Sequence, residues 1–208
     1  MSLTVFLAAC PVGAQSIIDP EAETAEPIQP GDDAIVPPTD DVPLVDNDRH
    51  ERIDALFAEL KRTADPRAAQ TIADGIWSHW YRSGSASIDL MMQWSNDALR
   101  DRRFHMALDF LDQVVIRAPD YAEGWNRRAT LHYTMNNLAK SMNDIQKVLE
   151  IEPRHFGALS GLAMILERNG NDRAALAAWQ RALAVYPAMQ SAQEAVIRLS
   201  DELAGDPV

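Results

Sequence analysis

Histidines and closely spaced carboxylates are the side chains of this sequence most suited to chemistry. The five histidines are His50, His79, His105, His132 and His155. No two of them lie within two helical turns of each other, and none has the histidine–carboxylate spacing of a metal site. We therefore interpret the histidines as structural or solvent-facing residues. Asp109 and Asp112 lie one helical turn apart, but carboxylates act as acid and base only in a cleft of low dielectric constant.

An aromatic pair offers the other chemical hypothesis. Trp77 and Trp80 could form a platform for a ligand beside His79, which would make the protein an enzyme or a small-ligand-binding subunit. At a spacing of three residues, however, such a pair is more often part of a helix core. The sequence has no glycine-rich phosphate loop and no G-x-S-x-G elbow. We expect no catalytic residues, no cofactor and no metal, and keep the aromatic platform as the alternative.

The charge of the chain is unevenly distributed. The 208 residues carry a net charge of −12, yet residues 15–48 hold ten acidic side chains and no Lys or Arg. From Arg49 onward, 21 acidic and 19 basic residues give a net charge of only −2. This balance argues against a nucleic-acid partner, because binding to phosphates needs a basic excess. The densest basic set is Arg100, Arg102, Arg103, Arg127 and Arg128. It either balances nearby carboxylates or receives an acidic partner or the acidic segment itself.

The N-terminal residues favour export. The apolar run 3–9 is far too short for a membrane span, which takes about 20 residues. It fits the core of a signal peptide over residues 1–14, although no basic residue precedes it. Cys10, the only cysteine, could instead be a lipidation site that anchors the protein to a membrane. Both hypotheses predict a periplasmic protein, which lipidation at Cys10 would anchor to the cell envelope. Residues 15–48 are rich in Pro, Asp and Glu, which predicts a disordered linker.

The remaining chain, 49–204, repeats. Pro119, Pro153 and Pro187 are spaced by 34 residues, a period typical of a helix–turn–helix solenoid. Three units, 88–119, 122–153 and 156–187, align at five positions. The aligned positions are Met91, Trp125 and Leu159; Ser95, Ala129 and Ala163; Ala107, Ser141 and Ala175; Leu111, Ile145 and Trp179; and Val114, Val148 and Ala182. Small residues at the second and third sets allow the two helices of a unit to cross closely.

Helices also flank these units. Residues 50–85 predict a degenerate helix pair, in which Asp65 is suited to an N-cap and Pro66 to the first helical position. Residues 188–204 predict a capping helix, which a repeat array needs to cover its last unit. The expected fold is therefore all-α, a solenoid of antiparallel helix pairs with a C-terminal cap.

The pattern resembles the tetratricopeptide repeat, with Trp125 and Ala129 opening the central unit, Ser141 in its middle and Pro153 closing it. This unit departs from the family at Arg128, where leucine is commoner, and at His132, where tyrosine is commoner. The resemblance implies a concave groove lined by the first helix of each unit. The groove residues that it implies are Met92, Asn96, Arg100, Glu123, Asn126, Thr130, Tyr133, Ser160, Met164 and Glu167.

These residues combine hydrogen-bonding and apolar side chains, a mixture suited to an extended or helical peptide. We therefore predict a non-catalytic module for protein–protein interaction that binds a peptide or protein segment. A self-assembling structural repeat is a further alternative. The sequence predicts neither the identity of the partner nor the oligomeric state.

Overall fold

The computed structural model describes residues 43–205, and their side chains from Arg49 onward. Within this range the chain forms nine helices and no strand, which confirms the all-α prediction. The helices are α1 (Pro43–Leu60), α2 (Pro66–Trp80), α3 (Ala86–Arg100), α4 (Phe104–Arg117), α5 (Ala122–Thr134), α6 (Leu138–Ile151), α7 (Phe156–Arg168), α8 (Asp172–Val185) and α9 (Gln190–Gly205). No helix of this described part is both long and apolar enough to cross a membrane.

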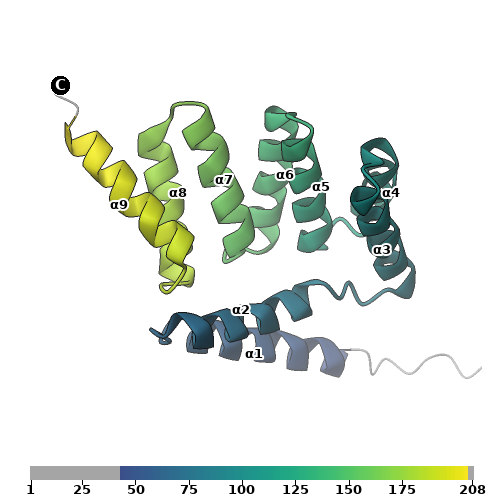
Figure 1. Cartoon of the computed structure of the whole chain (residues 1–208). Coiled ribbons are helices and arrows are strands. Elements are labelled where there is room, and N and C mark those ends of the chain that lie inside the picture. The colour runs from purple at the N-terminus through teal and green to yellow at the C-terminus, as the bar shows by residue number, and fades with distance from the viewer. Residues whose placement is uncertain (1–42, 206–208) are drawn as a thin grey trace, which may run out of the picture. The chain divides into compact units, whose positions relative to one another are not determined.

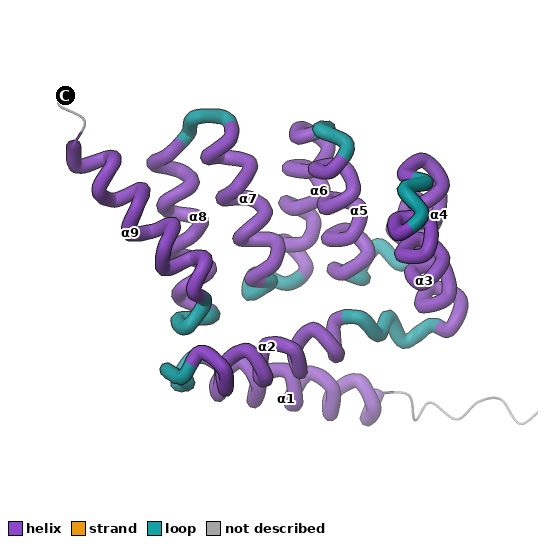
Figure 2. Tube along the Cα trace, viewed as in Figure 1, coloured by secondary structure: helices purple, strands orange, loops and turns teal. Residues whose placement is uncertain are grey.

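Three helix pairs form a row, α3/α4, α5/α6 and α7/α8, and α9 packs against α8 at its C-terminal end (Figure 1). Only short loops separate consecutive helices of the row (Figure 2). The bounds of the pairs agree within two residues with the predicted units 88–119, 122–153 and 156–187. The predicted capping helix is present as α9, which buries Ala192, Ala195 and Leu199. The structure is thus an α-solenoid.

Small residues hold the helices of each pair together. Ser95, Ala107, Ala129, Ser141, Ala163 and Ala175 are all buried. In the central unit the Ser141 hydroxyl donates to the Ala129 carbonyl at 2.8 Å, so these two positions meet directly. Trp125 is half-buried, its indole Nε1 donates to the Pro119 carbonyl at 2.8 Å, and the Arg128 guanidinium lies 4.8 Å from its ring centroid. It therefore joins the unit to the preceding loop.

The same type of turn connects the two helices of each pair. Arg102, Asn136 and Gly170 occupy equivalent positions and have φ angles of 57°, 62° and 71°. The amide of the next residue donates to a carbonyl five residues earlier, as from Asn137 to His132 at 2.8 Å. This is the Schellman motif, which requires a left-handed residue at the end of the helix. Only Gly170 meets that requirement without steric cost.

The first helix pair does not continue the row. Its predicted N-cap is confirmed, since Asp65 accepts a hydrogen bond from the Ala68 amide at 2.8 Å. However, α1 and α2 do not stack on α3/α4 as a repeat would. They run across the ends of the later helices (Figure 1), where Phe57 and Trp80 share a core with Phe156 of α7 and with residues of the α8–α9 loop.

The N-terminal predictions lie largely outside the described residues. The signal peptide 1–14 and the possible lipidation site Cys10 are not described. The predicted linker 15–48 overlaps the structure only at its end, where α1 begins at Pro43. The first residues of α1 therefore belong to a helix rather than to a linker.

Candidate functional site

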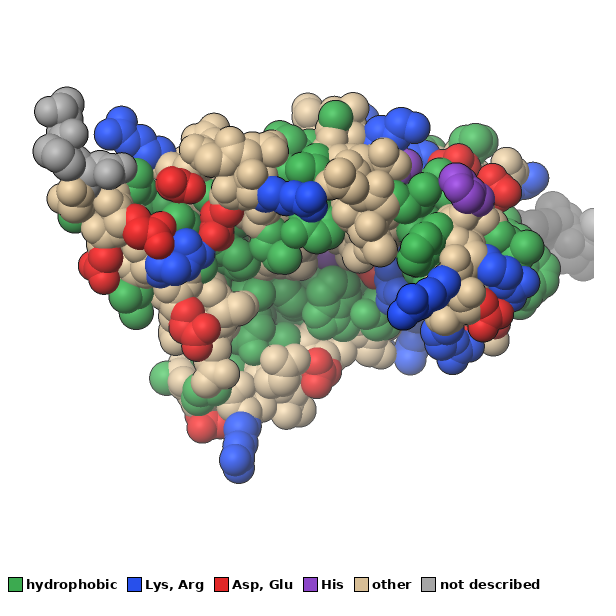
Figure 3. Space-filling model, turned by 45° about the horizontal axis from the view of Figure 1, so that its top comes forward, with side chains coloured by type: hydrophobic (Ala, Val, Ile, Leu, Met, Phe, Trp, Pro, Cys, Tyr) green, Lys and Arg blue, Asp and Glu red, His purple; other side chains and the backbone are tan. Residues whose placement is uncertain are grey.

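A pocket of about 330 Å³ lies on the inner face of the array, between α5 and α7. Figure 3 shows a hollow in which hydrophobic side chains gather, with acidic and basic side chains around it. The lining residues are Asn126, Ala129, Thr130, Tyr133, Ser141, Ile145, Gly157, Ala158, Ser160, Gly161, Met164 and Ile165. Five of them, Asn126, Thr130, Tyr133, Ser160 and Met164, are predicted groove residues, so the fold brings half of that set together.

Hydroxyl groups supply the polar part of this lining. The Thr130 hydroxyl donates to the Asn126 carbonyl at 2.9 Å, and the Ser160 hydroxyl donates to the Phe156 carbonyl at 2.8 Å. Because each hydroxyl donates its proton to a carbonyl of its own helix, the lone pairs of its oxygen remain available to accept a hydrogen bond from a ligand. Backbone amides of an extended segment are suitable donors. Met164 beside them is 45% exposed and offers a flexible apolar contact.

Glycines on α7 give the pocket its depth. A Cβ atom at Gly161 would lie 3.3 Å from Ile145 Cδ1, which is tighter than an ordinary contact. A Cβ atom at Gly157 would lie only 2.8 Å from the Trp77 ring. Gly157 therefore lets the tryptophan of α2 approach α7, while Gly161 keeps the floor of the pocket open over Ile145.

The chain matches no protein-family model. It is 54% identical over 156 residues to a TPR repeat-containing protein of Rhizobium etli, and the match covers 75% of this chain and 76% of that protein. The chain belongs to the tetratricopeptide repeat (TPR) proteins. Its TPR array is also similar to solved TPR domains, at sequence identities that establish the fold alone.

Three of these solved structures, each with a TM-score above 0.5, illustrate the similarity. The TPR domain of Arabidopsis OM64 has a TM-score of 0.52 and 19% identity, over 55% of this chain and 95% of that domain. The first TPR domain of Spaghetti (RPAP3), solved with the HSP90 peptide SRMEEVD, has a TM-score of 0.54 and 15% identity, over 57% of this chain and 94% of that one. A third, the TPR2B domain of yeast Sti1 in a complex with pHsp70, has a TM-score of 0.52 and 16% identity, over 57% of this chain and 99% of that one.

Two predicted groove residues of α5 belong to a buried network of the TPR array. Glu123 is 1% exposed. Its carboxylate accepts hydrogen bonds from Arg127 Nε at 2.6 Å and from Asn126 Nδ2 at 2.8 Å, and lies 3.4 Å from His155 Nε2. Glu123 is thus removed from the surface that a ligand could touch, and Asn126 reaches the pocket with its amide already engaged.

The other predicted groove residues lie outside the pocket. Met92 is buried in the core of the first unit. Asn96 accepts from Arg127 Nη1 at 2.8 Å, and exposed Arg100 pairs with Asp97. Glu167 accepts hydrogen bonds from the Trp179 indole and the Arg198 guanidinium at the C-terminal end of the array. Of the predicted groove residues, those that line the pocket all lie on α5 and α7.

His155 has structural contacts that its sequence position did not reveal. It is fully buried, and its Nδ1 accepts a hydrogen bond from the Ala158 amide at 3.1 Å, which caps α7. The neutral ring must then carry its proton on Nε2, which faces the Glu123 carboxylate. The imidazole also stacks on Trp80, with ring centroids 4.0 Å apart.

The aromatic pair that suggested a ligand platform is part of this core. Trp80 is 6% exposed, and Trp77 is half-buried with its ring 5.4 Å from that of Phe156. Burial, followed by the charge of Arg49, lowers the pKa of nearby His79. One face of each indole is covered, that of Trp80 by His155 and that of Trp77 by Tyr81, while Trp77 also lines a pocket of about 420 Å³ beside α7 and the α8–α9 loop.

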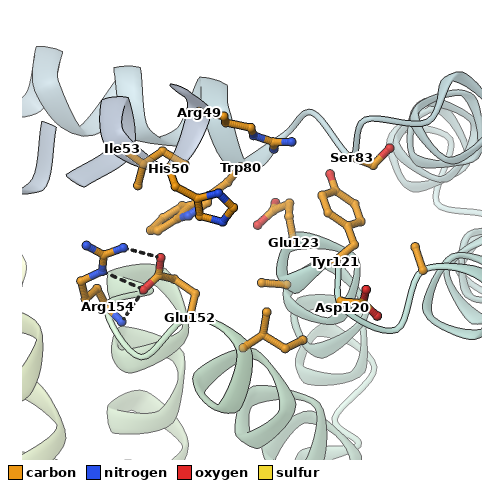
Figure 4. Close-up of a pocket in the computed structure, with 13 residues that line it drawn as sticks. Arg49, His50, Ile53, Trp80, Ser83, Asp120, Tyr121, Glu123, Glu152 and Arg154 are labelled. Carbon is orange, nitrogen blue, oxygen red and sulfur yellow. Dashed lines mark hydrogen bonds and ion pairs between the residues drawn. The ribbon is translucent and has the colours of Figure 1, made fainter. Parts of the chain in front are cut away.

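A second pocket, of about 400 Å³, lies between α1 and the starts of α5 and α7 (Figure 4). Its charges are largely engaged. Arg154 pairs with Glu152 at 2.9 Å and with Asp54 at 2.7 Å. Arg49 donates to the carbonyls of His79 and Arg82 at the end of α2. The Arg154–Asp54 pair fastens the first helix pair to the TPR array, whereas Arg49 joins α1 to the end of α2.

Arg128 and His132, the two departures from the repeat pattern, surround a buried carboxylate on the outer face. Arg128 donates to both oxygens of Asp144, at 2.8 and 2.7 Å, and to Asp112 at 2.8 Å. The hydrogen bond to Asp144 raises the pKa of Arg128. His132 Nε2 lies 3.9 Å from the same carboxylate. Among the described residues, no cluster of three or more His, Cys, Asp or Glu side chains could hold a metal ion.

Proposed function

We propose that this TPR protein is a non-catalytic interaction module that holds a peptide or protein segment against α5 and α7. The observation that carries the proposal is the open pocket between these helices, with an apolar floor and acceptor hydroxyls at its sides. An extended segment would donate backbone amides to Thr130 and Ser160 and insert an apolar side chain over Ile145. The peptide complex of the Spaghetti domain and the pHsp70 complex of Sti1 support this use of the fold.

Blocking the pocket tests the proposal. The double variant Thr130→Glu and Met164→Glu places two charges at exposed sites beside the pocket, where they need not disturb the core. We expect recovery of partner proteins from a cell extract to fall by at least about tenfold. The matched control is Gln113→Glu with Gln180→Glu, at exposed positions on α4 and α8. If both double variants recover partner proteins equally well and keep the wild-type melting temperature, the proposal that the partner binds in this pocket is refuted.

We further propose that the module works in the bacterial periplasm or at the envelope. The support is the apolar run 3–9, followed by either a cleavage site near Ala14 or a lipidation site at Cys10. Mass spectrometry of the mature N-terminus from cells separates these possibilities. A chain that begins after residue 14, or at a lipid-modified Cys10, supports export. A chain that retains Met1 in the cytoplasm would rule it out.

A further inference from the structure

The outer face of α3 and α4 exposes a stripe of apolar side chains on each helix. Leu90 and Trp94 lie one turn apart on α3 and are 42% and 45% exposed. Met106 and Phe110 lie one turn apart on α4, and Met106 is 42% exposed. The rings of Trp94 and Phe110 are 5.5 Å apart, which joins the two stripes into one surface. These four residues are called the end face below.

The positions equivalent to Leu90 and Phe110 are buried in both later units. Leu90 corresponds to Gly124 and to Ala158, which is 1% exposed. A Cβ atom at Gly124 would lie 2.7 Å from Val114 Cγ1, so unit one packs tightly on unit two. The end face is therefore the surface of the array on which a preceding unit would stack.

Nothing in the described part of the chain covers this face, because α1 and α2 run across the ends of the later helices instead (Figure 1). Terminal units of repeat proteins usually carry a polar outer face, which keeps the array soluble. At the other end of the row, α9 supplies such a cover. The end face, with an exposed Trp flanked by Leu, Met and Phe, is apolar where a terminal unit is usually polar, which indicates a contact surface.

The charges that border the end face indicate what covers it. Arg100 pairs with Asp97, and Arg103 pairs with Asp101 at 2.6 Å, so these two charges are already compensated within the chain, which leaves Arg102 of the same turn as an unpaired cation among the described residues. A polyanion, such as the acidic segment 15–42 with its eight carboxylates, would find little charge to neutralise. A border compensated except at this one cation, around an apolar centre, is self-complementary, since two copies can face each other with little net repulsion at the contact.

We propose that the end face is the contact surface of a homodimer. A twofold axis would pack α3 and α4 of one copy on the same helices of another and bury both copies of Trp94 at the centre. The pocket between α5 and α7 lies elsewhere on the array and stays open in both copies. A partner with two binding segments would then bind with avidity.

The test is the molar mass of the full chain across about 1–200 µM, measured by sedimentation equilibrium, because dimerisation depends on concentration. We expect the mass to rise toward twice the 23.1 kDa of one chain. Trp94→Glu should raise the dissociation constant by about 100-fold or more, because two anchors and two new charges meet at the axis. Met106→Glu should act in the same direction. The control Ile197→Glu changes a 64% exposed residue of α9 and should leave the dimer intact.

Hydrogen exchange of residues 86–100 distinguishes a second copy of the chain from the acidic segment as the group that covers the end face. In a homodimer, protection of α3 rises with protein concentration. A monomer at every concentration would overturn the proposal, and so would a dimer that Ile197→Glu disrupts but Trp94→Glu does not. A monomer whose α3 is protected at low salt and exposed at about 1 M salt would instead show that the acidic segment covers the face.

Discussion

The imidazole of His155 lies on the indole of Trp80, with ring centroids 4.0 Å apart and planes inclined by 9°. The contact joins α2 to the start of α7, a region that also carries the pocket-lining residues Gly157 and Ser160. Trp77 packs edge-on against the same imidazole at 5.3 Å. The first helix pair is therefore a brace that fixes the N-terminal end of α7 rather than an extra repeat.

Removing this contact should weaken the fold. Trp80→Ala deletes a large side chain that is 6% exposed, so we expect the free energy of unfolding to fall by about 3–5 kcal/mol. Urea titration followed by circular dichroism measures the loss. Ile197→Ala is the control, because that side chain is 64% exposed and lies away from the proposed dimer contact, so it should cost much less. Similar losses for the two variants would contradict the assignment of Trp80 to the core.

The buried Glu123 carboxylate is the second structural test. Glu123→Ala removes the acceptor of Arg127 Nε and of the Asn126 amide and the carboxylate that faces His155 Nε2, so the free energy of unfolding should fall by about 2–4 kcal/mol. Glu123→Gln should cost less, because the amide oxygen still accepts one hydrogen bond. Glu150→Ala on the exposed face of α6 serves as a control and should change stability little. A neutral effect of Glu123→Ala would show that the side chain is solvated.

Stability should also depend on pH through His132. Burial lowers the pKa of His132 below its usual 6.5, and the charges of Arg128 and Lys140 act in the same direction against the attraction of Asp144. The unfolded chain therefore binds a proton more readily, so stability is full above about pH 6.5 and falls as the pH drops toward the folded-state pKa. His132→Gln should show a smaller loss of unfolding free energy between pH 7.5 and 5.5. An identical slope in wild type and variant would contradict this role.

The turn of the first unit is less favourable than the others. Arg102 has a φ of 57° where the third unit has Gly170. Because glycine adopts this conformation without steric cost, Arg102→Gly should raise the free energy of unfolding by up to about 1 kcal/mol. Gly170→Ala should change it in the opposite direction. Thermal unfolding of both variants checks the pair, and destabilisation by Arg102→Gly would show that its side chain makes a contact worth more than the strain.

The sequence was sufficient to predict the row of helix pairs, because its periodicity reflects local rules. Small residues such as Ala129 and Ser141 recur where helices cross, and prolines end each unit. The path of α1 and α2 was not predictable in this way. It depends on side chains over 70 residues apart, such as Trp80 and Phe156, whose pairing leaves no periodic signal.

The same limit applies to the site. The repeat register places Thr130, Tyr133 and Met164 on the inner face, and all three line the pocket. It also assigns Glu123 to that face, because a helical position alone does not show that Arg127 and Asn126 enclose the carboxylate. His155 directly precedes a predicted helix, but histidine is not among the preferred N-cap residues, so its cap of α7 and its place beside Glu123 could not be predicted.

The central claim is that a partner segment lies between α5 and α7, and photo-cross-linking in living cells tests it most directly. A photoreactive amino acid at Met164, inside the pocket, should yield a specific cross-linked protein. The same group at Gln180, exposed on α8, should not. Capture at Gln180 but not at Met164 would contradict the account, as would the same products from both positions.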